Sequence, residues 1–221
     1  MCIRDRLYTE GGCLMDKRHF IFDIDGTLIN TEKAIIKGLQ ELLLEVKGVP
    51  YEPEQLYFCL GIPGPITLKQ LGVEGDLTAV LKKWDAYYCK HGGDVTIYPD
   101  IPEVLKKLKE NGISLGVITS KNQEEYDYDM IRLGLADYFS ITVTATDTSE
   151  HKPDPAPMLF YLEKAGILPE QAVYIGDSIY DMKCAEGAGV PRALALWGCR
   201  NPEEITADYR LSRPIDILGL V

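Results

Sequence analysis

The stretch Phe20-Ile21-Phe22-Asp23-Ile24-Asp25-Gly26-Thr27-Leu28 decides the fold prediction and contains the first candidate site residues. Its apolar residues favour a buried strand, and Asp23 and Asp25 stand two positions apart near the carboxyl end of that strand. In an extended strand, side chains at i and i+2 point to the same face, so the two carboxylates project together. Burying two like charges is costly without a cation or a proton between them. We therefore expect positive charge here, beside the turn that Gly26 permits and the hydroxyl group of Thr27.

Length and composition indicate a globular protein. The 221 residues are enough for one sizeable core with an insertion or a small second domain. Hydrophobic residues make up 46% of the chain and charged residues 26%, as is usual for globular proteins. The 23 basic and 34 acidic residues give a net charge of −11, which disfavours nucleic acid or an anionic membrane as a partner. No apolar run is long enough to span a bilayer.

The cysteines are scattered and include no C-x-x-C pair. This pattern favours reduced thiols in a cytoplasmic protein over a zinc cluster or a disulfide framework. The six are Cys2, Cys13, Cys59, Cys89, Cys184 and Cys199.

The first residues do not resemble the rest of the chain. Met1 to Leu14 carries two arginines but lacks the apolar core of a signal peptide. Met15 is followed almost at once by the first strand. We expect Met15 to be the natural start and residues 1–16 to be a non-native or disordered extension.

From Tyr98 onward, apolar runs alternate with helix-like segments. The predicted strands after the first one are Ile113–Thr119, Ser140–Thr144, Ala172–Gly176 and Arg192–Leu196. The predicted helices run from an N-cap at Asp100 to Gly112 and over Gln123–Leu133, Pro155–Ala165 and Ser178–Ala188, with a helical turn at Pro202–Ile205. This alternation predicts an α/β fold, a Rossmann-like parallel sheet covered on both faces.

The segment between the first strand and Tyr98 is predicted to be helical throughout. Thr31–Lys47 has apolar residues at helical spacing, and short helical pieces follow over Pro53–Cys59, Pro65–Leu71 and Asp76–His91. We therefore predict an inserted helical cap over residues 31–97 and a core formed by residues 17–30 and 98–221.

Polar residues follow each predicted strand at the same edge of the sheet, where ligands of such sheets bind. Asp23 and Asp25 follow the first strand, and Thr119 and Ser120 end the second. His151-Lys152-Pro153 follows the third, and Gly176-Asp177-Ser178 begins a segment after the fourth that continues to Asp181.

In this order, the residues resemble the motifs of the haloacid dehalogenase superfamily, whose nucleophile motif D-x-D-G-T is matched at every fixed position by Asp23 to Thr27. The resemblance covers about Lys17 to Trp197. It is greatest to the branch with a helical cap after the first strand, which contains phosphoglycolate phosphatases, pyrophosphatases and β-phosphoglucomutases.

The chemistry of phosphoryl transfer fits these residue types. A carboxylate can attack phosphorus to form an aspartyl phosphate, and the resemblance implies that Asp23 is this nucleophile. Asp25 matches the family's acid/base, which protonates the leaving group and then activates water. Thr119 and Lys152 would complete the catalytic set, because donors and cations must surround the equatorial oxygens. The predicted phosphate-binding residues are Gly26, Thr119, Ser120 and Lys152. A solvated surface charge is the alternative for Lys152, and His151 is expected to be a bystander.

Magnesium prefers a few carboxylates together with waters and substrate phosphate. The predicted ligands are Asp23, the Asp25 carbonyl and Asp177. Asp181, one helical turn later, would support the metal without binding it directly. A charge that stabilises a helix N-terminus is an equal alternative for Asp181.

The predicted function is Mg2+-dependent hydrolysis of a small phosphorylated metabolite, as in phosphoglycolate phosphatases, by a monomer or weak homodimer. One alternative is a sugar phosphomutase, although no histidine occurs over residues 31–38, where mutase relatives carry one. The other is a non-catalytic phosphoacceptor domain of receiver type. The loop Gly61–Pro65 could face the site, and Lys37 or Lys69 could meet an acidic group of the substrate.

Overall fold

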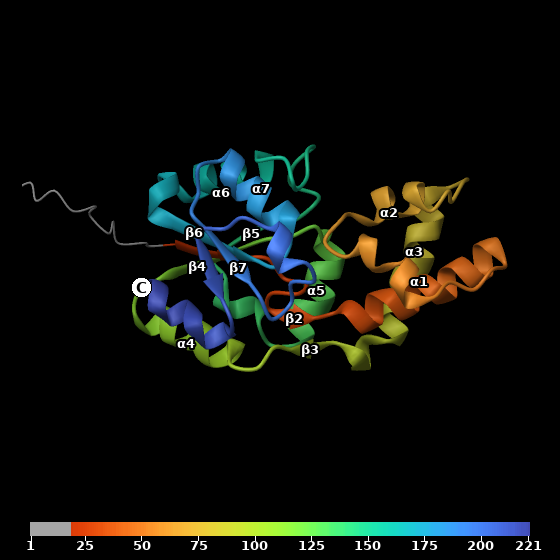
Figure 1. Ribbon diagram of the computed structural model, residues 1–221, viewed down its shortest axis with the longest axis horizontal. Helices are drawn as coiled ribbons and strands as arrows, with labels where there is room; N and C mark the ends of the chain where they lie inside the picture. Colours follow the sequence, from red (N-terminus) through yellow and green to blue (C-terminus); the bar gives the residue numbers. More distant parts are fainter. Residues whose placement is uncertain (1–18) are drawn as a thin grey trace, which may run out of the picture.

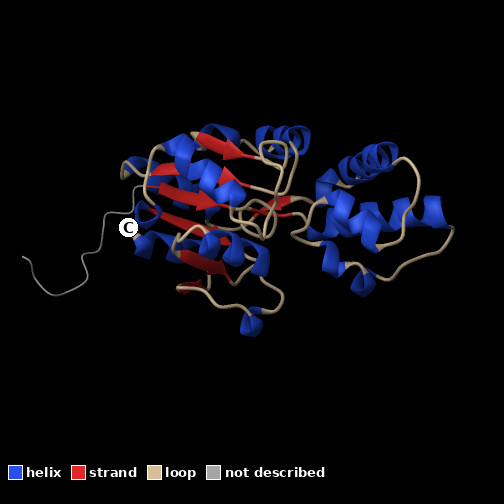
Figure 2. Ribbon diagram, turned by 90° about the horizontal axis from the view of Figure 1, so that it is seen from above, coloured by secondary structure: helices blue, strands red, loops and turns tan. Residues whose placement is uncertain are grey.

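The computed structural model describes residues 19–221, which form two units joined by a narrow connection (Figure 1). One unit contains a central sheet with helices packed on it, and the other is helical. The connection is a two-stranded antiparallel ribbon in which β2 (Ile29–Asn30) pairs with β3 (Thr96–Ile97). Figure 2 shows this ribbon at the junction of the two units.

The sheet has six parallel strands in the order β5-β4-β1-β6-β7-β8. The strands are β1 (His19–Phe22), β4 (Ser114–Ile118), β5 (Ile141–Val143), β6 (Ala172–Gly176), β7 (Arg192–Ala195) and β8 (Tyr209–Leu211). Strand β1 lies between β4 and β6, so the motif that follows it stands in the middle of the sheet edge. The predicted α/β fold with a parallel sheet is confirmed.

Helices cover both faces of the sheet (Figure 2). They are α4 (Ile101–Glu110), α5 (Gln123–Arg132), α6 (Ala156–Ala165) and α7 (Ile179–Gly187). Successive side chains of β1 point to opposite faces of the sheet. Phe20 and Phe22 pack into one core with residues of α4 and α5. Ile21 points the other way, into a second core with residues of α6 and α7. Both faces are therefore buried, as the continuous apolar runs predict.

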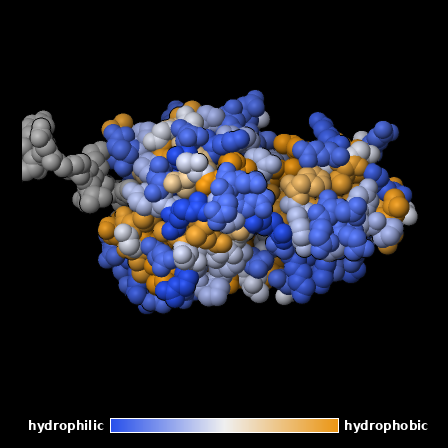
Figure 3. Space-filling view, viewed as in Figure 1, coloured by the Kyte–Doolittle hydropathy of each residue, from blue (hydrophilic) through white to orange (hydrophobic). Residues whose placement is uncertain are grey.

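The helical unit contains α1 (Glu32–Lys47), α2 (Gly64–Gln70) and α3 (Leu77–Lys90). Its own core joins apolar residues of α1 to those of α2 and α3, including Leu39, Leu43 and Leu68. Gly48 ends α1 in the left-handed conformation, and the Asp76 side chain accepts hydrogen bonds from two backbone N–H groups at the start of α3. On the face drawn in Figure 3, apolar residues form scattered patches among hydrophilic ones.

Three details differ from the sequence predictions. Residues 53–59 form two 3-10 turns, Pro53–Gln55 and Tyr57–Cys59, in place of one helical piece. Asp100 precedes α4 as predicted, but it adopts a left-handed conformation and its side chain makes no capping bond. The edge strand β8 and the 3-10 segment Pro214–Leu220 were not predicted.

The prediction for residues 1–16, including the start at Met15, lies outside the described residues. Within residues 19–221, no helix has both the length and the apolar character needed to cross a membrane.

Candidate functional site

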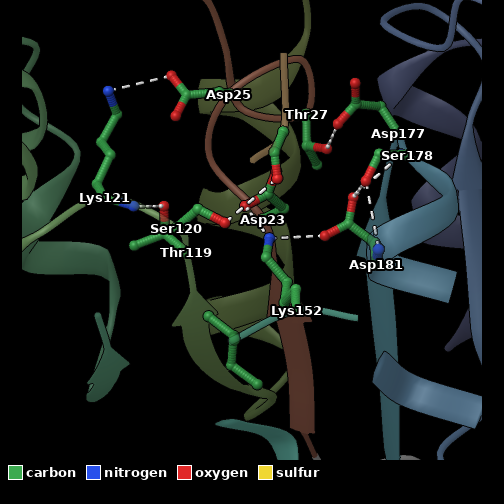
Figure 4. A network of polar contacts seen from close by, with 12 residues as sticks. Asp23, Asp25, Thr27, Thr119, Ser120, Lys121, Lys152, Asp177, Ser178 and Asp181 are labelled. Atoms are coloured by element: carbon green, nitrogen blue, oxygen red, sulfur yellow. Dashed lines mark hydrogen bonds and ion pairs between the residues drawn. The ribbon is translucent and has the colours of Figure 1, made fainter. Parts of the chain in front are cut away.

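The site lies where the central strands end. Asp23 directly follows β1, Thr119 follows β4 and Asp177 follows β6, and the three strands are parallel neighbours. Lys152 comes from the segment that leads from β5 into α6, and Asp181 from the first turn of α7. Figure 4 shows the side chains of these residues converging at one place.

Lys152 stands at the centre of this arrangement. Its Nζ lies 2.8 Å from Asp23 Oδ1 and 2.7 Å from Asp181 Oδ1, and its side chain is almost completely buried. Burial lowers the pKa of Lys152, but Asp181 and Asp23 outweigh this effect and raise the pKa above its ordinary value. The ammonium group is therefore charged at neutral pH, and the surface-charge alternative for this lysine is wrong.

Tyr174, in the middle of β6, contacts both Lys152 and Asp181. Its hydroxyl oxygen lies 3.3 Å from Lys152 Nζ, 3.0 Å from Asp181 Oδ1 and 3.0 Å from the Ile118 carbonyl oxygen. The ring is fully buried. Tyr174 was not predicted as a site residue, because a tyrosine in an apolar strand also fits a purely structural core.

Three carboxylates form a cluster around the ammonium group. Asp23, Asp177 and Asp181 each offer an oxygen, and these oxygens lie within 4.8 Å of one another. Burial raises the pKa of Asp23 to about 7; Lys152 opposes this, while Asp181 and Asp25 add to it. Burial, Asp181 and Asp23 likewise raise the pKa of Asp177 well above its ordinary value. One ammonium group does not balance two buried carboxylates and a half-buried one, so the cluster can hold a metal cation.

At Gly26, the backbone of the Asp23–Thr27 motif passes close to the Asp177 carboxylate. Its φ of +80° is in the left-handed region, and a Cβ added to it would lie 2.2 Å from Asp177 Oδ2. The neighbouring Thr27 hydroxyl donates to Asp177 Oδ1 at 3.2 Å. A second backbone approach comes from Gly198, where an added Cβ would overlap the Gly26 carbonyl oxygen at 1.9 Å. Glycine is required at both positions because the chain segments touch.

Asp181 takes part in the cap of helix α7 and also belongs to the carboxylate cluster. Its Oδ2 accepts hydrogen bonds from Ser178 N at 3.0 Å and from Ser178 Oγ at 2.6 Å, which forms a capping box at the start of α7. Its Oδ1 faces Lys152. The two sequence interpretations of Asp181 are therefore compatible, since each uses a different oxygen.

Asp25 points away from the cluster, towards Lys121 (Figure 4). Its Oδ1 accepts a hydrogen bond from Thr31 Oγ1 at 2.6 Å and lies 3.2 Å from Lys121 Nζ. Lys121 is also buried, lies 3.0 Å from Asp129 Oδ2, and stands 5.0 Å from the centre of the Tyr88 ring. Lys121 was missed in the sequence, although its place just after Thr119-Ser120 was an available signal.

The segment after β4 connects the two units. Thr119 N donates to the Val143 carbonyl oxygen at 3.0 Å, and Thr119 Oγ1 accepts from Lys121 N at 3.2 Å. Ser120 Oγ donates to the Gly61 carbonyl oxygen in the helical unit at 3.4 Å. Tyr88 of α3 donates to Asp129 Oδ2 of α5 at 2.7 Å. These contacts place the helical unit over the carboxyl edge of the sheet.

A cavity of about 130 Å³ lies between the units, beside Asp25 and Asp177. The loop predicted to face the site contributes Gly61, Ile62 and Gly64 to its wall. Neither lysine considered for the substrate is part of the wall. Lys37 instead pairs with Asp94 at 2.8 Å, and Lys69 is exposed on α2.

Comparisons with known proteins agree with this geometry. The family described as haloacid dehalogenase-like hydrolase matches residues 20–195. Phosphoglycolate phosphatase from Aquifex aeolicus is 33% identical over 214 residues, which cover 92% of this chain and 96% of the relative. A protein of Caldanaerobacter subterraneus, provisionally described as pyrophosphatase PpaX, is 35% identical over 80% of each chain.

A solved structure shows the same architecture. The crystal structure of a protein from Lactobacillus plantarum, provisionally described as a phosphoglycolate phosphatase, has a TM-score of 0.86 and 30% sequence identity. The match covers 94% of this chain and 100% of that one. The chain therefore belongs to the haloacid dehalogenase-like hydrolase family, and it is a phosphatase-type enzyme of that family.

Proposed function

We propose that the chain is a Mg2+-dependent phosphatase that hydrolyses a small phosphorylated metabolite through an aspartyl phosphate at Asp23. The observation that carries this proposal is the buried cluster in which Lys152 bridges Asp23 and Asp181, with Asp177 beside them. Such a cluster supplies a nucleophile, a fixed positive charge and carboxylates for a divalent cation at one place. Small-molecule phosphate esters are the proposed substrates.

In the first step, a carboxylate oxygen of Asp23 attacks phosphorus and the bond to the leaving oxygen breaks. Lys152 neutralises Asp23 before the attack and a phosphoryl oxygen during it, because its ammonium group is held within 2.8 Å of the nucleophile. Thr119, Ser120 and the backbone at Gly26 would hold the remaining phosphoryl oxygens. These roles rest on the position of each residue at the carboxyl edge of the sheet.

Asp25 is the proposed acid and base. It would protonate the departing oxygen and then take a proton from the water that hydrolyses the aspartyl phosphate. Thr31 and Lys121 hold its side chain towards the cavity, where a leaving group would lie. Lys121 is thus proposed to position Asp25 and does not itself contact the phosphoryl group.

The residues present fit Mg2+. Asp23 and Asp177 supply carboxylate oxygens, the Asp25 carbonyl is the proposed third ligand, and Asp181 is proposed to orient Lys152. Burial and the neighbouring carboxylates raise the pKa of Asp23 and Asp177, and this penalty on the charged forms is the observation in favour of a cation. When bound, Mg2+ would offset the charge on the phosphoryl oxygens.

We propose that residues 31–97 act as a cap. The unit touches the sheet edge through Ser120 and Tyr88, and its removal from the edge would open the cavity to water. The narrow ribbon of β2 and β3 is the proposed hinge. We also propose a cytoplasmic location, which the free thiols of Cys59 and Cys184 support.

The relatives' names make phosphoglycolate and pyrophosphate the first candidate substrates. The phosphomutase alternative stays a prediction with a direct test, since a mutase would isomerise a sugar phosphate faster than it hydrolyses it. The phosphoacceptor alternative has its own outcome, because it requires a long-lived phosphoaspartate without turnover.

The decisive experiment is hydrolysis of p-nitrophenyl phosphate with and without EDTA, by the wild type and Asp23→Asn. We expect both EDTA and the substitution to abolish turnover. Asp127→Asn is the matched control, because Asp127 lies on the exposed face of α5 and bonds to Gln123. Activity retained in Asp23→Asn would refute the assigned nucleophile.

A further inference from the structure

The cavity between the units offers a small space for the leaving group. Its volume of about 130 Å³ is close to that of cavities that hold a single benzene ring, which are about 150 Å³. It opens beside Asp25 and Asp177, so a phosphoryl group at Asp23 would direct its leaving oxygen into this space. In this arrangement of the two units, a compact leaving group fits the cavity.

Charge in the wall of the cavity is mostly negative. Carboxylates of Glu32, Asp85 and Glu125 line it in addition to those of Asp25 and Asp177. Within residues 19–221, the lysine or arginine in the wall is Lys121 alone. Its ammonium group is already shared between Asp25 and Asp129, at 3.2 and 3.0 Å. No unshared cation in the wall is therefore available to an anionic leaving group.

Asp85 and Glu125 form a carboxyl pair in the wall of the cavity. They come from α3 and α5 and share a hydrogen bond. Burial raises the pKa of both groups, that of Glu125 to about 7, while the nearby Lys121 ammonium group opposes the rise in each case. Glu125 Oε2 also accepts a hydrogen bond from Asn122 N at 2.7 Å, which fixes the carboxyl group in place.

Aromatic rings stand beside this pair. Trp84 directly precedes Asp85 in α3, and Tyr88 follows it by three residues. Both rings line the cavity, and Lys121 Nζ already stands 5.0 Å from the centre of the Tyr88 ring. Rings attract cations through their faces, and carboxylates attract them through charge. A wall with both features favours a positively charged group and disfavours a carboxylate or phosphate, which would be placed against Asp85 and Glu125.

We propose that the substrate is the phosphate ester of a compact amino alcohol, whose ammonium group binds at Asp85 and Glu125 beside Trp84. This inference rests on the proposed phosphatase function and specifies its substrate class. It separates the chain from the relatives whose names give phosphoglycolate or pyrophosphate as substrate, because both of those leaving groups are anions.

Three two-carbon phosphate esters of nearly equal size test the inference, since they differ in the terminal group. They are 2-aminoethyl phosphate, 2-hydroxyethyl phosphate and phosphoglycolate. We expect kcat/KM to fall in this order, by about tenfold or more at each step, as charge pairs at partly buried sites differ by at least that much. Asp85→Asn and Glu125→Gln should each reduce the ratio of the amine to the carboxylate at least about tenfold.

The outcomes separate the two proposals. If p-nitrophenyl phosphate and all three esters remain intact, the proposed function is wrong and the inference falls with it. If the aryl phosphate is hydrolysed but phosphoglycolate or the neutral ester is preferred over the amine, the inference alone is overturned. Unchanged ratios in both variants would also overturn it, whatever their absolute rates.

Discussion

Asp23→Asn should make the metal-free protein more stable while removing its activity. Burial and neighbouring carboxylates raise the pKa of Asp23 from 3.8 to about 7. The charged form of this group is therefore less favourable in the folded protein than in the unfolded chain. A raised acid pKa contributes stability at low pH that is lost as the pH rises from about 4 through about 7. An asparagine at this position carries no charge and avoids that loss.

The size of the effect follows from the shift. One pKa unit corresponds to about 1.4 kcal/mol, so the gain in unfolding free energy should be about 2 kcal/mol at pH 5.5 and about 4 kcal/mol at pH 8. For a chain of this size, 1 kcal/mol changes Tm by about 2–4 °C, which gives roughly 8–16 °C at pH 8. Added Mg2+ should reduce this difference in unfolding free energy, because it stabilises the wild type more than the variant.

Thermal unfolding followed by circular dichroism in EDTA at the two pH values measures this difference. Asp25→Asn is the matched control, since the Asp25 carboxylate already pairs with Lys121 at 3.2 Å and its neutralisation removes a favourable contact. An Asp23→Asn protein that is no more stable than the wild type at pH 8 would refute the electrostatic description of the cluster.

Other substitutions test separate parts of the site. Lys152→Met removes the ammonium group between Asp23 and Asp181 and should lower kcat for an aryl phosphate by about 10²–10³ at saturating Mg2+; a loss below threefold would contradict its role. Gly26→Ala would place a Cβ 2.2 Å from Asp177 Oδ2, so we expect at least about tenfold weaker Mg2+ binding by calorimetry, and unchanged affinity would count against Asp177 as a ligand. Tyr88→Phe removes the hydrogen bond to the fully buried Asp129 carboxylate and should cost about 1–3 kcal/mol in urea unfolding. An equal unfolding midpoint would show that this contact between the units adds no stability.

Strong local signals made most of the core predictable. Strand β6 has the predicted bounds, Ala172–Gly176, because five apolar or small residues stand between clear turn signals. Helix α5 begins at the predicted Gln123, after its cap Asn122. Helix α7 begins at Ile179, one residue after the predicted start, because Ser178 is its cap. Strand β8 escaped prediction because it is a three-residue edge strand with an exposed Arg210 at its centre.

The candidate site was predictable to the extent that its residues follow strands. Asp23, Thr119 and Asp177 meet at one edge because β1, β4 and β6 are parallel neighbours, a consequence of topology that the alternation of elements already implies. Tyr174 was not predicted because a tyrosine in an apolar strand also fits a structural core, and Lys121 because its partner Asp25 lies far away in the sequence. The charge of the cavity wall was equally hidden, because it depends on which faces of α3 and α5 meet.

The most direct test of the account is to identify the residue that carries the phosphoryl group during turnover. The wild type is mixed with substrate and Mg2+, quenched in acid, and treated with borohydride, which reduces an aspartyl phosphate to homoserine. Peptide mass spectrometry should find homoserine at position 23 in the substrate-treated sample and aspartate in the untreated one. Homoserine at Asp25 or Asp177, or an unmodified Asp23 in an enzyme trapped during turnover, would contradict the assignment on which the proposed mechanism depends.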